Sequence, residues 1–152
     1  QPDFFATSAG TGTTATGLLL SATQHQKVMV FSGLKGGEFL KDDIKHLINY
    51  TTYNSEDTDD ILQHLNLITD YHFGGFAKIT PELVEFTNAF YRQFQIPLDL
   101  IYTSKLFYGL FDMIRKNHFK PHSKIVALHT GGLQGNNGFS GQMKKMGISL
   151  IY

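Results

Sequence analysis

The chain has 152 residues, a formal net charge of zero and no cysteine. This length is enough to bury a sizeable core, and it predicts a single domain over residues 1–152. A zero net charge argues against surfaces that bind nucleic acid or anionic membranes. The missing cysteines exclude disulfides and thiolate chemistry, and no apolar run approaches the ~20 residues of a membrane helix. Together these features favour a cytoplasmic protein.

The first predicted element is a short strand at Phe4–Ala6, followed by a loop of small residues over Thr7–Thr14 and a helix that begins at Ala15. Glycines let a ligand approach the backbone, hydroxyl groups add donors, and the first N–H groups of a helix are free to bind an anion. The expected ligand is a phosphate. The pattern matches neither a Walker A loop nor Gly-x-Gly-x-x-Gly, and a tight turn without a ligand is the alternative.

Hydrophobic periodicity predicts two more strands and two helices in the first half of the chain. These are a strand over 27–31, a turn over 32–37, a helix over 38–50, an acidic stretch over 53–60 that leads into a short helix over 58–65, and a strand over 66–71.

In the second half, Thr80 as N-cap and Pro81 at the first helical position predict a helix that Pro97 ends. A second helix is expected over 106–116 and a strand over 124–128, and a helix followed by a short extended end is expected near the C-terminus.

This alternation of strands and helices predicts an α/β fold, a three-layer αβα arrangement with a largely parallel sheet. In such sheets the loops after the strands gather at one edge, where ligands bind. Five candidate loops follow predicted strands or apolar runs and are therefore expected to surround one cleft: 7–14, 32–37, 72–76, 102–104 and 129–135.

Three of these loops resemble the ordered signatures of one family. They read Ala-Gly-Thr-Gly-Thr-Thr-Ala-Thr-Gly at 9–17, Tyr-Thr-Ser-Lys at 102–105 and His-Thr-Gly-Gly at 129–132. In order and spacing they are similar to the pyridoxal-phosphate enzymes that include 1-aminocyclopropane-1-carboxylate deaminase and D-cysteine desulfhydrase, within the tryptophan-synthase-β-like fold. The resemblance runs from about Phe4 to about Gly138. It implies the Rossmann-like large domain of a fold-type-II enzyme.

The resemblance implies a role for each matching residue of the first two loops. Thr11, Gly12, Thr13 and Thr14 match the cradle for the phosphate of pyridoxal 5'-phosphate, in agreement with the helix start expected there. Tyr102 matches a catalytic tyrosine that faces the substrate and can assist proton transfer. The implied substrate is a small amino acid.

Two threonines match positions near the pyridine nitrogen of the cofactor. Thr103 stands where the deaminase has glutamate and the desulfhydrase has threonine, and Thr130 lies in the third loop. A hydroxyl partner leaves that nitrogen less readily protonated than a carboxylate does, so the cofactor is a weaker electron sink. This favours elimination chemistry over the opening of a cyclopropane ring.

Two departures from the family pattern affect the expected activity. In the family, the Schiff-base lysine and most of the small domain lie far upstream of the phosphate loop. The chain is therefore interpreted as the C-terminal part of a longer enzyme. It is expected to be inactive alone. Lys27, Lys35 and Lys105 do not replace that lysine in register. Phe76 falls where characterised members place a second substrate-side tyrosine.

Other functions find less support in the residues. The alternative from a different class is a non-catalytic Rossmann-like module that binds a phosphorylated small molecule, and a third possibility is a structural fragment with an empty phosphate site. The seven histidines lack metal-ligand spacing, and His129 is interpreted as structural. No serine lies in a Gly-x-Ser-x-Gly elbow. A homodimer is implied by the family alone.

Overall fold

The computed structural model describes residues 1–52 and 58–152, so most of the predicted acidic stretch lies outside the described residues. Four parallel strands form one sheet in the order β3-β2-β1-β4. The elements are β1 (Phe4–Ala9), α1 (Thr13–Ser21), β2 (Lys27–Ser32), η1 (Gly37–Phe39), α2 (Leu40–Thr52), α3 (Thr58–Leu62), β3 (Leu65–Ile68), α4 (Pro81–Phe94), α5 (Thr103–Arg115), β4 (Ile125–Ala127), η2 (Leu133–Phe139) and α6 (Ser140–Met146).

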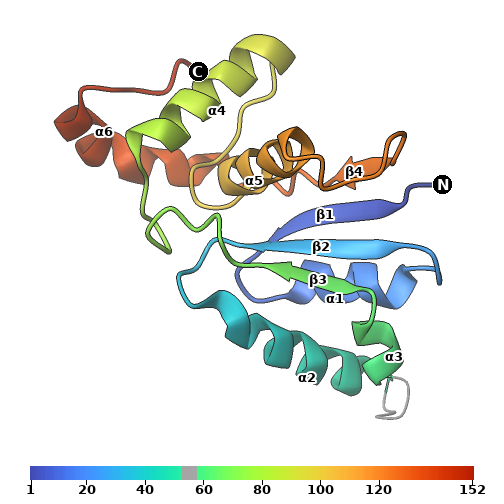
Figure 1. The fold of residues 1–152 in the computed structure, drawn as a ribbon. Coiled ribbons are helices and arrows are strands. Elements are labelled where there is room, and N and C mark those ends of the chain that lie inside the picture. The colour runs from blue at the N-terminus through green and yellow to red at the C-terminus, as the bar shows by residue number, and fades with distance from the viewer. Residues whose placement is uncertain (53–57) are drawn as a thin grey trace.

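Helices cover both faces of the sheet, because successive residues of a strand point to opposite sides. On β2, Val28 and Val30 pack into one core with residues of α1 and α2. Met29 and Phe31 pack into a second core with residues of α5. Figure 1 shows α1, α2 and α3 on one side of the sheet and α4, α5 and α6 on the other. The predicted three-layer αβα arrangement with a parallel sheet is therefore confirmed.

The first strand is longer than predicted. It continues to Ala9, and Thr7, Ser8 and Ala9 pair with Val30–Ser32 of β2. The β-branched Thr7 suits a strand position, and it is fully buried. The glycine- and threonine-rich loop is consequently reduced to Gly10–Gly12, which brings the start of α1 close to the carboxyl end of β1.

Two boundaries around the third strand also differ. Helix α3 ends at Leu62 rather than at residue 65, and β3 ends at Ile68 rather than at residue 71. The strand stops there because its pairing with β2 ends at Phe31. Residues 69–80 form the connection to α4. Thr80 caps that helix as predicted, its side chain accepting a hydrogen bond from the backbone N–H of Leu83.

The apolar run that precedes the predicted loop at 102–104 covers residues 98–101, and it is a buried turn and not a strand. Helix α5 begins directly after this turn, at Thr103 rather than at Leu106. The third hydrophobic cluster explains the burial of the run, since Leu100 packs there with Val84 of α4 and Phe139. The loop at 102–104 is thus the first turn of a helix.

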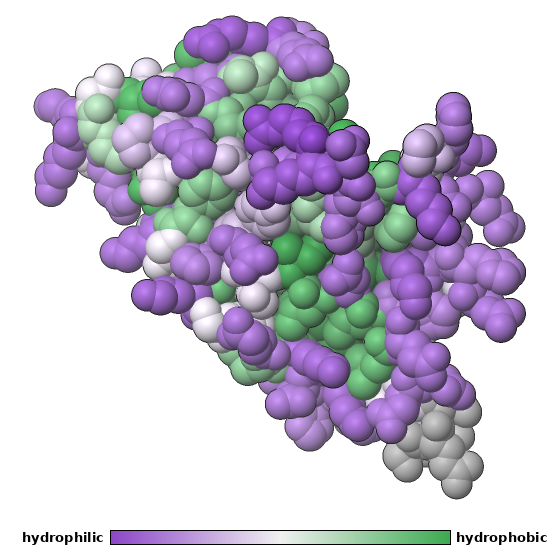
Figure 2. Space-filling view, in the orientation of Figure 1, coloured by the Kyte–Doolittle hydropathy of each residue, from purple (hydrophilic) through white to green (hydrophobic). Residues whose placement is uncertain are grey.

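On the face shown in Figure 2, a hydrophobic area lies over the region where β3 and α3 lie in Figure 1. These two elements contribute partly buried apolar residues that pack against the core: Ile61, Leu62, Leu65 and Leu67. β3 is an edge strand of the described sheet. Among the described residues, no helix is long and apolar enough to cross a membrane.

Candidate functional site

The start of α1 forms a small hollow at the carboxyl end of β1. Its volume is about 60 Å³. The lining residues are all small and neutral: Ser8, Ala9, Gly10, Thr11, Gly12, Thr13 and Thr14.

The donors at this hollow fit an anion. No side chain caps α1, and its first turn contains no acidic residue. The hydroxyls of Thr11 and Thr13 lie 3.3 Å apart, both exposed. A helix start carries free N–H groups and a partial positive charge, so the chemistry of the donors matches the phosphate cradle expected from the sequence.

Gly12 is required by the geometry of this turn. Its φ of 80° lies in the left-handed region, and a Cβ at this position would lie 2.7 Å from Cγ1 of Ile44 on α2. A side chain would therefore have both an unfavourable backbone and an overlap with the core. The loop keeps its shape because residue 12 has no side chain.

Tyr102 lies beside the phosphate loop. A Cβ at Gly10 would lie only 2.7 Å from its hydroxyl oxygen, so the phenol packs directly against the backbone at Gly10. A Cβ at Gly33, just after β2, would lie 3.5 Å from its ring. The ring of Phe76 is 6.3 Å away, measured between centroids. The predicted meeting of the first four loops at one edge is therefore observed around Tyr102.

The phenol of Tyr102 is held in its neutral form at neutral pH. Burial raises its pKa, and the carboxylate of Asp99 raises it further. A neutral phenol can donate a proton, and in contact with an anion it can also donate a hydrogen bond. Its half-buried position beside an exposed Phe76 leaves one side open to a ligand.

Asp99 holds the start of α5. Its carboxylate is 1% exposed and accepts hydrogen bonds from the backbone N–H groups of Ile101 (2.9 Å), Tyr102 (2.8 Å) and Thr103 (2.9 Å). These N–H groups have no partner within the helix, so the side chain acts as its cap. Asp99 thereby fixes the backbone of Tyr102.

The hydroxyl of Thr103 belongs to the same cap. It donates to Oδ2 of Asp99 at 2.6 Å and accepts from the backbone N–H of Asp99 at 2.8 Å, and the residue is fully buried. Its single proton is thus committed to Asp99. The predicted contact with the pyridine nitrogen stays a prediction, and a donated hydrogen bond there would require Thr103 to leave Asp99.

Thr130 is exposed on the turn that follows β4. The same turn contacts the Asp99 cap, since a Cβ at Gly132 would lie 3.1 Å from the Asp99 carboxyl carbon. The fifth predicted loop therefore lies next to the other four, while the role of Thr130 at the cofactor ring stays a prediction.

We expect Asp99→Ala to destabilise the protein strongly. The substitution leaves three backbone N–H groups and the Thr103 hydroxyl without their acceptor, and the loss of a cap with buried donors amounts to about 2 kcal/mol or more. Asp42, an exposed acid in the first turn of α2, supplies the control: Asp42→Ala should change stability by less than about 0.5 kcal/mol. The midpoint of urea unfolding of the full-length protein measures both. Equal midpoints for the two variants would rule out the capping role.

His129 has the structural role expected of it. Its Nδ1 accepts a hydrogen bond from the backbone N–H of Gly131 at 3.2 Å, and its Nε2 lies 2.7 Å from the carbonyl oxygen of Pro97. The ring therefore ties the turn after β4 to the segment before α5. In the part of the chain that the structure describes, no cluster of three or more His, Asp or Glu side chains could hold a metal ion.

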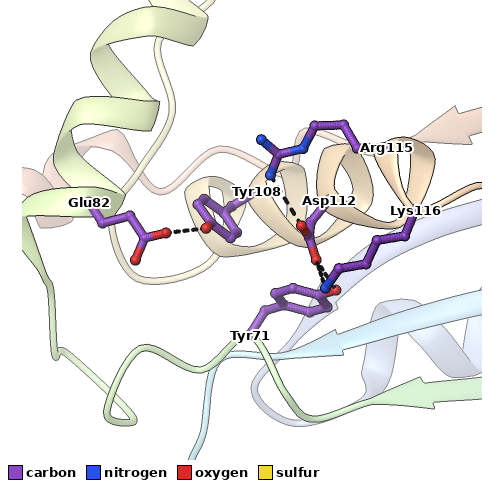
Figure 3. A network of polar contacts seen from close by, with 6 residues as sticks. All are labelled: Tyr71, Glu82, Tyr108, Asp112, Arg115 and Lys116. Carbon is purple, nitrogen blue, oxygen red and sulfur yellow. Dashed lines mark hydrogen bonds and ion pairs between the residues drawn. The ribbon is translucent and has the colours of Figure 1, made fainter.

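A polar network on α5 anchors the connection that carries Phe76 (Figure 3). The hydroxyl of Tyr71 donates to Asp112 at 2.7 Å, and Lys116 and Arg115 form ion pairs with the same carboxylate. Hydrogen bonds from Lys116 and Tyr71 lower the pKa of Asp112, and burial together with this carboxylate raises the pKa of Tyr71 to about 12. Tyr108 donates to Glu82 and so links α5 to α4. The network supports the site from outside it.

Known proteins share this fold and much of this sequence. A protein of Pyrococcus furiosus named "Putative 1-aminocyclopropane-1-carboxylate deaminase" is 30% identical over 138 residues, which are 88% of this chain and 40% of the relative. One of Pyrococcus horikoshii with the same name is 32% identical over 133 residues, with the same coverage of both chains. A crystal structure described as an ACC deaminase homologue superimposes with a TM-score of 0.76 and 27% identity, over 95% of this chain and 44% of that one.

Over 88% of its length the chain is homologous to proteins named putative 1-aminocyclopropane-1-carboxylate deaminase. No family model matches it. The chain spans about two fifths of the length of the curated deaminase homologues it matches. The resemblance carried by the three loop motifs is thus confirmed at the level of the family.

The contacts of two residues next to the candidate site were not predicted from the sequence. Asp99 was hidden in an apolar run, although an aspartate just before a helix is a common capping signal. Lys105 was considered only as a Schiff-base candidate, yet it is 1% exposed and its Nζ donates to two backbone carbonyls. The small and apolar residues that repeat along α5, including Gly109 four residues after Lys105, are the sequence signal that could have revealed the burial of Lys105.

Proposed function

We propose that the chain is the cofactor-binding part of a pyridoxal-phosphate-dependent lyase or deaminase that acts on a small amino acid. The observation that carries the proposal is the contact between Gly10 and Tyr102. In this contact the phenol of Tyr102 lies next to the uncapped start of α1, with glycine at the point where the two meet. The names of the relatives support the same reaction class.

In this proposal Thr11, Gly12, Thr13 and Thr14 bind the phosphate and thereby orient the cofactor. When bound, pyridoxal phosphate withdraws electrons from the α-carbon of an amino-acid substrate. Tyr102 takes part in proton transfer through its phenol oxygen. Phe76 forms an apolar wall of the substrate pocket and excludes water from it. A lysine outside residues 1–152 supplies the covalent attachment. A homodimer is part of the same proposal.

Phe76 and Thr103 together favour a D-cysteine desulfhydrase-like activity over a 1-aminocyclopropane-1-carboxylate deaminase-like one. The hydroxyl proton of Thr103 is committed to Asp99, so no acidic or strongly donating group from this residue reaches the cofactor ring. Phe76 is 56% exposed beside Tyr102 and has no hydroxyl for proton transfer. Both features suit elimination from a substrate that carries a good leaving group.

The full-length protein loaded with pyridoxal phosphate tests this proposal. Both candidate substrates should release ammonia if they react, whereas only D-cysteine can release sulfide. We expect ammonia and sulfide from D-cysteine, and much slower ammonia release from 1-aminocyclopropane-1-carboxylate. Binding of a phosphorylated ligand without product from either amino acid would favour the non-catalytic module instead.

A further inference from the structure

Lys105 is a buried cation beneath the candidate site. It extends from the first turn of α5 and is 1% exposed. Its Nζ donates hydrogen bonds to the carbonyl oxygen of Gly75 at 2.8 Å and to that of Gly33 at 3.3 Å. A buried ammonium is unfavourable unless its hydrogen bonds are satisfied, so these contacts explain how the charge is tolerated.

The two carbonyls belong to the two loops that touch Tyr102. Gly33 packs against the ring of that residue and the backbone just before it, since a Cβ there would lie 3.5 Å from the ring and 2.9 Å from the carbonyl oxygen of Ile101. Gly75 directly precedes Phe76, whose ring faces Tyr102. Lys105 is therefore connected to the side chain of Tyr102 through these two loops, independently of the backbone of α5.

The contact from Lys105 ties the loop around Gly75 to α5. Gly74 and Gly75 have φ values of 95° and 117°, and neither has a side chain that could anchor the segment. The hydrogen bonds within the loop are local: the N–H groups of Gly74 and Gly75 donate to His72, and the N–H of Lys78 donates to the carbonyl of Gly75. Because glycine pairs allow wide backbone movement, the bond from Lys105 to the same carbonyl adds a restraint from outside the loop.

We propose that Lys105 is a positioning residue, which fixes Tyr102 and Phe76 at the site by holding the loops at 32–37 and 72–76 to the start of α5. The catalytic consequence rests on the proposed function, whereas the holding of the loops does not. Burial lowers the pKa of the amine to about 8, and the carboxylate of Asp99 opposes this shift. At neutral pH the amine is thus protonated, with three donors for the two carbonyls.

Lys105→Met in the full-length protein tests the proposal, because methionine retains much of the aliphatic stem and removes the donors. Amide hydrogen exchange at 33–37 and 72–76 should become about 10-fold faster or more, the effect of losing a hydrogen bond from a charged group. The kcat should fall by up to about 10²-fold through misplacement of Tyr102, with the affinity for pyridoxal phosphate retained. In Lys105→Gln the amide can still donate to one carbonyl. Its exchange rates and kcat should therefore lie between those of the wild type and those of Lys105→Met.

Leu110→Ala is the matched control, since Leu110 is also buried on α5 but packs in the core with Met29 and Phe31. It should lower stability without changing kcat or accelerating exchange in the two loops selectively. The proposal is overturned if Lys105→Met behaves like Leu110→Ala, if the loops exchange faster while kcat is unchanged, or if neither Lys105 variant folds. Should the wild type bind no pyridoxal phosphate, the proposed function fails, and the exchange data alone then decide whether Lys105 holds the loops.

Discussion

Tyr102→Phe is expected to lower kcat of the full-length enzyme by about 10²–10⁴-fold, the usual contribution of a positioned proton donor or acceptor. The phenol lies against Gly10 at the phosphate loop, and its raised pKa keeps it protonated at neutral pH. Phenylalanine keeps the ring and its packing against Gly33 and Phe76. The loss should therefore appear in kcat, while the visible absorbance of bound pyridoxal phosphate stays unchanged.

A second tyrosine provides the control for this experiment. Tyr91 on α4 packs its ring 4.7 Å from that of Tyr152, away from the candidate site. Tyr91→Phe should leave kcat within about twofold of the wild type, since surface substitutions away from special features are nearly neutral. If Tyr102→Phe also retains wild-type kcat, the proton-transfer role assigned to Tyr102 is wrong.

Gly12→Ala is expected to abolish tight binding of pyridoxal phosphate and to destabilise the protein by about 2–4 kcal/mol. The left-handed backbone contributes about 1–2 kcal/mol, and the overlap of the new Cβ with Ile44 contributes a similar amount. The loop can relieve this overlap only by moving, and the movement displaces the N–H groups of Thr13 and Thr14. Titration with pyridoxal phosphate and urea unfolding measure the two effects.

The same helix contains the matched control. A Cβ at Gly17 of α1 meets nothing within 4 Å, and the residue lies in the interior of the helix. Gly17→Ala should therefore stabilise the protein by about 0.5–1 kcal/mol and leave cofactor binding intact. Equal cofactor affinity in the two variants would show that the start of α1 does not bind the phosphate.

The sheet and the phosphate loop could be predicted from the sequence because their signals are local. Alternating strands and helices indicate a parallel sheet, and small residues between a strand and a helix indicate an anion site. Even there, the strand predicted from the sequence is shorter than β1, because the pairing of Thr7–Ala9 with β2 depends on a partner about twenty residues away. Strand ends are set by their partners and not by their own residues alone.

The centre of the site could not be predicted in the same way. Leu98–Ile101 is apolar enough for a strand, but Asp99 within it folds the segment into a cap through four hydrogen bonds from Ile101, Tyr102 and Thr103. Lysine normally lies on the exposed face of a helix, and Lys105 is buried only because two loops from other parts of the chain supply carbonyls. Such tertiary partners leave no local pattern.

A crystal structure of the full-length protein with pyridoxal phosphate is the most direct test of the central claim that this chain holds the cofactor by its phosphate. We expect the phosphate in the hollow at the start of α1, within hydrogen-bonding distance of the N–H groups of Thr13 and Thr14 and on the same side of the sheet edge as Tyr102. A phosphate bound elsewhere in the protein, with the loop at Gly10–Thr14 empty, would contradict it.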